Sequence, residues 1–143
     1  MRQEEKNLLL KDLCTRLPYQ VKVKLHDEIC TVLGYVDDFI ILTSDTPIGQ
    51  QTNIVNVKPY LRPMESMTEE EGKELERLFC EIDAPCWVDT TYGCVTFAGD
   101  NDFIDAEIAE VYTDWLNAHH FDYRGLIPIG LALEAPKDMY NVK

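Results

Sequence analysis

Long apolar runs are absent from this sequence. The nearest candidate, Phe39–Leu42, has only the length of a strand, far short of the roughly 20 residues that a membrane-spanning helix needs. The amino terminus is mixed in charge, and the apolar triplet at residues 8–10 is too short for the centre of a secretory signal. These absences predict a soluble, cytoplasmic protein that does not bind a membrane.

Glycine-rich phosphate loops, dinucleotide fingerprints and calcium loops are also absent. The seven glycines are isolated from one another, whereas each of those motifs needs its glycines at set positions within one loop. The sequence contains no internal repeat and no low-complexity segment. It therefore predicts no cofactor.

The chain lacks an even number of cysteines. It has five, so they cannot all form disulfide bonds with one another. An odd number in a domain of this size is typical of reduced thiols in the cytosol. Cys14 falls on the apolar stripe of a predicted helix and Cys30 falls in a predicted strand. Both positions suit a small buried hydrophobic residue better than a reactive thiol.

Basic residues are scarce in the second half of the chain. Residues 1–64 hold eight basic and eight acidic residues, whereas residues 65–143 hold five basic and eighteen acidic residues. The second half thus accounts for the whole net charge of −13. Such a surface repels nucleic acid, so we expect no direct nucleic-acid binding, while a basic protein partner is compatible with it. A merely solvated surface would account for the same charge.

The periodicities that are present indicate a chain of mixed helices and strands. Leucines between Leu8 and Leu17 predict a helix that ends before Pro18. Alternating valine and lysine predict a strand at residues 21–25. Further strands are predicted at residues 29–36, 39–43 and 53–57, and the four strands together make an antiparallel meander.

The second half carries the signals of two acidic helices. A capping box at Thr68 predicts the start of one helix, and Pro85 bounds it. Residues 84–98 then predict a hairpin, which is a candidate insertion. Asp100 or Asp102 caps the second helix, which has one apolar stripe.

The predicted fold class is α+β, with an N-terminal helix, a four-stranded antiparallel meander, and two acidic amphipathic helices with the hairpin between them. Residues 58–63, which contain two prolines, are extended and join a neutral part, 1–64, to an acidic helical part, 65–143. The two parts share one core, so residues 1–143 form a single domain. A short helical turn and an extended tail complete the chain.

Three stretches of the sequence carry a family resemblance. They are residues 13–18 (LCTRLP), 57–71 (VKPYLRPMESMTEEE) and 114–140 (DWLNAHHFDYRGLIPIGLALEAPKDMY). With them the chain resembles a family of small uncharacterised proteins common in gut Bacteroidales genomes, including their prophages and other mobile elements. The resemblance implies no activity, cofactor or catalytic residue.

Five residues have the chemistry of a zinc site, namely Cys80, Cys86 and Cys94 with His119 or His120. Paired zinc ligands usually stand roughly two to four residues apart. Here five residues separate Cys80 from Cys86, and seven separate Cys86 from Cys94. One histidine with Cys94 would alternatively make a nucleophile and base pair. A metal- or thiol-dependent enzyme built on these residues is the alternative function.

A plainer interpretation of the histidines is that the second acidic helix ends there. Histidines near a carboxyl terminus hydrogen-bond the last carbonyls and suit the helix dipole. In this interpretation Phe121 packs in the interior, and Arg124 pairs with Asp122 or a carbonyl. We therefore predict no catalytic, cofactor-binding or metal-binding residue.

The acidic helices are the remaining candidate for a binding surface. Carboxylates at phosphate-like spacing would mimic nucleic acid and inhibit a DNA-binding protein, whereas the ordinary fate of such charges is a solvated helix face. The sequence thus favours a non-enzymatic accessory or protein-interaction module of a mobile element. The candidate interaction residues are Glu69, Glu70, Glu74, Asp105, Glu110 and Asp114.

Overall fold

The computed structural model describes residues 1–37, 39–43, 49–97 and 106–140. Contacts between residues divide the chain into two compact units. Unit 1 consists of Met1–Arg62 and Asn117–Lys143, and unit 2 consists of Pro63–Leu116. Unit 2 is therefore inserted into unit 1 along the sequence. The single domain over residues 1–143 stays a prediction.

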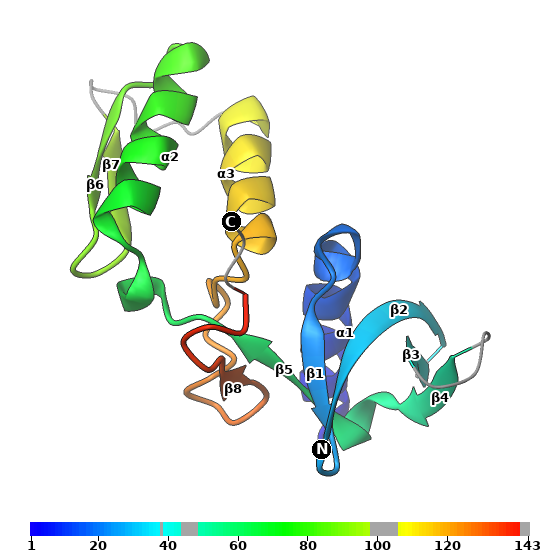
Figure 1. Cartoon of the computed structure of the whole chain (residues 1–143). Coiled ribbons are helices and arrows are strands. Elements are labelled where there is room, and N and C mark those ends of the chain that lie inside the picture. The colour runs from blue at the N-terminus through cyan, green and yellow to red at the C-terminus, as the bar shows by residue number, and fades with distance from the viewer. Residues whose placement is uncertain (38, 44–48, 98–105, 141–143) are drawn as a thin grey trace. The chain divides into compact units, whose positions relative to one another are not determined.

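Unit 1 has an N-terminal helix, α1 (Gln3–Arg16), and, over the described residues, a six-stranded mixed sheet. Its strands lie in the order β4-β3-β2-β1-β5-β8 (Figure 1). Adjacent strands are antiparallel except β5 and β8, which are parallel. The α+β class and the N-terminal helix are confirmed. The strands are β1 (Lys22–Leu25), β2 (Glu28–Val36), β3 (Phe39–Leu42), β4 (Gln50–Asn53), β5 (Val57–Leu61) and β8 (Leu133–Glu134).

The core of unit 1 follows from the periodicity of α1 and β1. Leu9 and Leu13 stand one helical turn apart, and both are buried. In β1 the inward side chains, Val23 and Leu25, alternate with lysines. These residues belong to one buried hydrophobic cluster, so α1 packs on the sheet through its leucine stripe.

The sequence predicts the fourth strand of the meander at residues 53–57, and this position is wrong. The side chain of Asn53 accepts a hydrogen bond from the Val55 backbone N–H at 3.1 Å, and this closes a 3₁₀ turn, η2 (Ile54–Asn56). The strand that pairs with β3 is β4, just before this turn. β4 has the sequence QQTN, so no apolar residue marks it.

The join at residues 58–63 and the carboxyl-terminal tail contribute strands that were not predicted. β5 pairs with β1 on one side and with β8 on the other. β8 pairs with β5 only at Tyr60 and Leu61, so at Pro59 the strand has a partner on one side alone. A proline is tolerated in a strand at such a place, because the donor that it lacks is not needed there.

Unit 2 consists of α2 (Glu69–Glu81), a hairpin of β6 (Cys86–Asp89) and β7 (Cys94–Phe97), a short 3₁₀ turn, η3 (Met64–Ser66), and most of α3 (Ala106–Ala118). The capping box at Thr68 is confirmed, since Thr68 Oγ1 accepts from the Glu71 N–H at 3.2 Å and Glu71 Oε1 accepts from the Thr68 N–H at 3.0 Å. The hairpin is also confirmed. The predicted caps of α3, Asp100 and Asp102, lie outside the described residues.

The ring of Phe79 is fully buried in the core of unit 2. It meets Phe97 of β7 edge-on at 5.0 Å between ring centroids and Tyr112 of α3 at 5.8 Å. Helix α2 therefore lies between the hairpin and α3, as Figure 1 shows.

Two glycines set how closely the parts of unit 2 approach one another. A Cβ at Gly72 would lie 2.7 Å from Thr90 Cγ2, so this glycine lets the hairpin sit directly on α2. Gly93 has a φ of +67°, and a Cβ there would lie 2.4 Å from the carbonyl oxygen of Met64. Only glycine fits this tight turn without strain.

The two segments of unit 1 that flank unit 2 in the sequence lie next to each other in space. The Arg62 N–H donates to the His120 carbonyl at 2.7 Å, and the Asp122 N–H donates to the Arg62 carbonyl at 2.7 Å. These two bonds form a parallel bridge between Arg62 and Phe121. Unit 2 is thus inserted between two segments of unit 1 that are hydrogen-bonded to each other.

Candidate functional site

A charged pair is buried at the centre of unit 1. Asp12 and Arg16 are fully buried on α1, and Arg16 Nε donates to Asp12 Oδ2 at 2.8 Å. Arg16 Nη2 also donates to the Phe121 carbonyl at 2.6 Å. Arg124 supplies a second cation, with its Nη1 2.8 Å from Asp12 Oδ1. The pair therefore ties the carboxyl-terminal segment to α1.

Asp122 holds the turn that follows it. Its Oδ1 accepts from the Leu126 N–H at 2.8 Å, and its Oδ2 accepts from the Ile127 N–H at 2.9 Å. The predicted pairing of Arg124 with Asp122 is therefore wrong, because backbone donors occupy the Asp122 carboxylate and Arg124 reaches Asp12 instead.

His120 lies in the same part of unit 1, stacked on Tyr140 with 3.6 Å between ring centroids. Burial, followed by the nearby charge of Arg16, lowers the pKa of His120 to about 4. Burial raises the pKa of Tyr140 to about 12, and its hydroxyl donates to the Tyr60 carbonyl at 2.8 Å. A histidine with so low a pKa is a weak base, which argues against its use in a nucleophile and base pair.

The three stretches that carry the family resemblance meet in this cluster. Arg16 of the first stretch donates to the Phe121 carbonyl of the third, and Arg62 of the second forms the bridge to Phe121. The guanidinium of Arg62 also lies over the Phe121 ring at 4.2 Å. Residues from all three stretches thus contribute to the interior of unit 1. The sequence signal that could have shown this is Asp12 and Arg16 in i,i+4 spacing on the leucine stripe of the first helix.

The structure divides the candidate zinc ligands between the two units. Cys80, Cys86 and Cys94 belong to unit 2, whereas His119 and His120 belong to unit 1. Within the described ranges, no group of three or more His, Cys, Asp or Glu side chains is placed to hold a metal ion.

Cys86 is unsuited to thiol chemistry. It is buried, and this burial, followed by the charges of Glu76 and Cys80, raises its pKa to about 11. The thiolate is the form that attacks a substrate or binds a metal, and Cys86 is held as the thiol. Cys80 and Cys94 are exposed.

Among the predicted interaction residues, most lie free on the surface of unit 2. Glu69, Glu70, Glu110 and Asp114 are exposed, and none of them forms a hydrogen bond or ion pair within the described part of the chain. Glu74 differs, because its Oε1 accepts from the indole N–H of the buried Trp115 at 3.0 Å. Asp105 lies outside the described residues.

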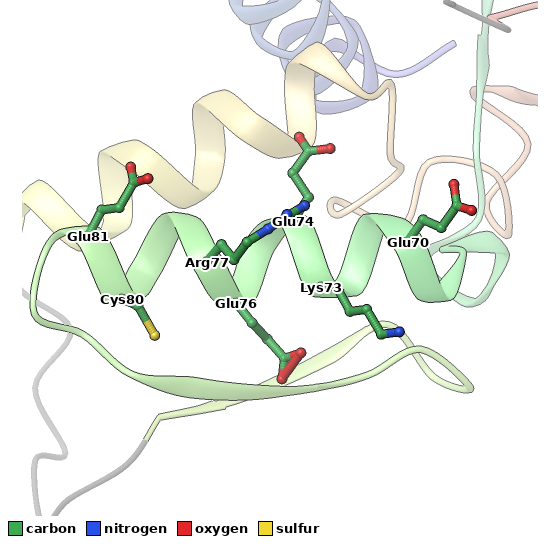
Figure 2. A pocket seen from close by; sticks show the side chains of 7 residues that line it. All are labelled: Glu70, Lys73, Glu74, Glu76, Arg77, Cys80 and Glu81. Atoms are coloured by element: carbon green, nitrogen blue, oxygen red, sulfur yellow. The ribbon is translucent and has the colours of Figure 1, made fainter.

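A shallow depression runs along α2. Figure 2 shows Lys73, Glu76 and Cys80 pointing toward the hairpin, and Glu74 toward α3. Glu76 Oε2 accepts from the Val88 N–H of β6 at 3.4 Å. The depression is lined by Glu70, Lys73, Glu74, Glu76, Arg77, Cys80 and Glu81, all from one helix. It is therefore an open charged surface and not an enclosed pocket.

The hairpin presents two aromatic side chains to solvent. Trp87 is 63% exposed and Tyr92 is 69% exposed. The outward face of β6 carries Trp87, whereas its neighbours Cys86 and Val88 are more buried. Exposed aromatic residues of this size are typical of contact surfaces.

Unit 1 also exposes several apolar side chains on β2 and β3, and sequence reasoning missed their exposure. The register between β2 and β3 shifts between Val32 and Gly34, where Leu33 is exposed. A bulge of this kind bends the strand and re-aims its side chains. The exposed apolar residues of these two strands are Ile29, Leu33, Tyr35, Val36 and Phe39.

Charge is distributed unequally between the units. Unit 2 contains fifteen acidic and two basic residues, whereas unit 1 contains eleven of each. The whole net charge of −13 therefore belongs to unit 2. The sequence located the first boundary of this acidic region near residue 64, but not the return to neutrality at Asn117.

No protein-family model matches the chain, and no curated protein or solved structure matches it either. In the part of the chain that the structure describes, no helix has the length and apolar character to cross a membrane.

Proposed function

We propose that the protein is a non-enzymatic interaction module whose unit 2 binds a basic protein partner. The observation that carries this proposal is the segregation of charge, which places the net −13 on 54 residues and leaves unit 1 neutral. A concentrated field of one sign raises the association rate with an oppositely charged partner. Unit 1 then serves as the folded support of the acidic unit.

The carboxylates of unit 2 are available to a partner. Every described acidic residue of unit 2 is exposed or partly exposed, and the buried acidic residues Asp12 and Asp122 both belong to unit 1. Four of the candidate residues have no hydrogen-bond or ion-pair partner among the described residues, so a basic protein would meet them without first breaking an ion pair of that part of the chain. This supports a binding role over a purely structural one.

A DNA-binding protein is the partner class that suits such a surface best. Proteins of this class carry clustered Lys and Arg that neutralise phosphates, and exposed carboxylates offer them the same sign of charge. The resemblance to proteins of prophages and mobile elements favours the same class, because such elements gain from blocking host proteins that act on DNA.

The experiment is affinity capture from a lysate of a gut Bacteroidales host, at low and moderate salt, with mass spectrometry of the retained proteins. The test variant removes four free charges of unit 2, as Glu69→Gln, Glu70→Gln, Glu110→Gln and Asp114→Asn. The matched control removes four exposed charges of unit 1, as Glu4→Gln, Asp27→Asn, Glu28→Gln and Glu134→Gln.

We expect a basic protein that is retained by the native chain and by the unit 1 control, and is lost from the unit 2 variant and at moderate salt. A specific partner that the unit 2 variant retains equally, or that resists salt, would contradict the proposal. The four altered residues of unit 2 are exposed and form no hydrogen bond or ion pair among the described residues, so we expect the variant to stay folded.

A further inference from the structure

The outward face of the hairpin in unit 2 is an unpartnered sheet surface. Trp87 pairs with Thr96 across the strands, and Asp89 pairs with Cys94. All four of these residues are exposed, while the alternate positions of both strands are turned toward the interior of unit 2. Because side chains alternate along a strand, Trp87 and Asp89 lie on the same face as nearest neighbours on β6.

Trp87 has no partner within the described part of the chain. Its indole makes no hydrogen bond, ring contact or cation–π contact there, although the cations of unit 1 repeatedly lie over rings, as Arg62 does over Phe121. A tryptophan that is 63% exposed leaves most of a ring face open to solvent. This surface would gain from a partner that covers it.

Asp89 places a carboxylate beside this ring. Its Oδ1 accepts from the Thr91 N–H at 3.0 Å, which fixes the side chain at the hairpin turn. Its Oδ2 has no hydrogen-bond partner among the described residues. A flat aromatic face next to an oriented carboxylate is the arrangement that a guanidinium group recognises, by stacking on the ring and donating to the oxygen.

We propose that the Trp87 and Asp89 face of the hairpin is the docking surface for an arginine-bearing segment of the basic partner. This inference rests on the proposed function and names the contact that gives it specificity. The charge of unit 2 attracts any cation, whereas the ring and the carboxylate together discriminate arginine from lysine.

The test uses two peptides of equal length and charge, with glycine and serine between the basic positions, one carrying arginine and the other lysine. Binding of each to the full chain is measured by calorimetry at low salt. We expect the arginine peptide to bind about twofold to fivefold more tightly than the lysine peptide, the range of a cation–π contact at an exposed site.

The variants are Trp87→Ala, Trp87→Phe and, as a matched control, Tyr35→Ala, which removes an exposed aromatic residue of unit 1. Trp87→Ala should abolish the preference for arginine, Trp87→Phe should keep part of it, and Tyr35→Ala should keep all of it. Trp87 and Tyr35 are 63% and 48% exposed, so none of these changes removes a buried side chain.

Equal binding of the two peptides, or a preference that survives in Trp87→Ala, would overturn this inference while leaving the proposed function intact, provided that binding still weakens with salt. Failure of both peptides to bind would overturn the inference and the proposed function together.

Discussion

Unit 1 buries Asp12, Arg16 and Asp122, whereas no described charged residue of unit 2 is buried. In unit 1 these groups bond to one another and to backbone atoms that are distant in sequence, so they specify one arrangement of the chain. In unit 2 the charges are left to solvent, and the core consists of aromatic and aliphatic side chains around Phe79. The same residue types therefore serve folding in one unit and remain available for binding in the other.

The largest expected effect on the free energy of unfolding comes from removing the buried cation of unit 1. Arg16→Met leaves the Asp12 carboxylate with Arg124 as its cation and removes the hydrogen bond that Arg16 donates to the Phe121 carbonyl. We expect a loss of about 3 to 5 kcal/mol in the free energy of unfolding, measured by urea denaturation. The control is Lys11→Met on the exposed side of the same helix, which should change the value by less than about 0.5 kcal/mol. Equal effects would show that the pair is not essential to the interior.

Phe79→Ala tests whether the two cores are separate. Loss of this buried ring should cost unit 2 about 3 to 5 kcal/mol, because the ring contacts to Phe97 and Tyr112 disappear and a cavity remains. Amide hydrogen exchange should show faster exchange in α2 with unchanged protection in α1 and β1. Exchange that rises equally in both units would mean that they unfold as one domain, as predicted from the sequence.

Protonation of His120 makes the folding stability of unit 1 depend on pH. Because its pKa falls from 6.5 to about 4 on folding, the unfolded chain binds the proton more tightly between these values. Stability is therefore complete above pH 6.5, falls as the pH drops toward 4, and loses up to roughly 3 kcal/mol from this group. Urea unfolding of the native chain and of His120→Gln across this range should show a shallower slope for the variant.

The smallest expected effect concerns the start of α2. Thr68→Ala removes the hydroxyl that accepts from the Glu71 N–H, and this should cost about 1 kcal/mol, read as a lower Tm. Thr68→Ser keeps the hydroxyl and should remain close to the native chain. A full loss in the serine variant would point to the methyl group and not to the cap.

The local elements of both units could be predicted, because their signals lie within a few residues. The capping box at Thr68 and the alternation in β1 are examples. β8 could not be predicted, since it is two residues long and exists through its pairing with β5, more than 70 positions earlier. The hydrogen bond from Arg16 to the Phe121 carbonyl could not be predicted for the same reason, because 105 positions separate the two residues.

For the candidate site, the composition indicated that the second half of the chain is acidic. It did not indicate that the excess of acidic residues is confined to one unit. Residues 117–140 return to unit 1, and only the three-dimensional contacts reveal this. The exposure of Trp87 was likewise undetermined by its sequence pattern, because a strand of four residues can bury either of its faces.

The paired ends of the insertion have a consequence for how such chains diversify. Since Arg62 and Phe121 are bridged within unit 1, the segments on either side of unit 2 are held together by unit 1 itself, which is the geometry that tolerates an inserted domain. A segment whose two flanking residues lie close together can also be replaced by another segment without a change in the connectivity of the remaining domain. Unit 2 is in this sense a cassette, because residues 63–116 form one continuous segment and every described strand of the mixed sheet lies outside it.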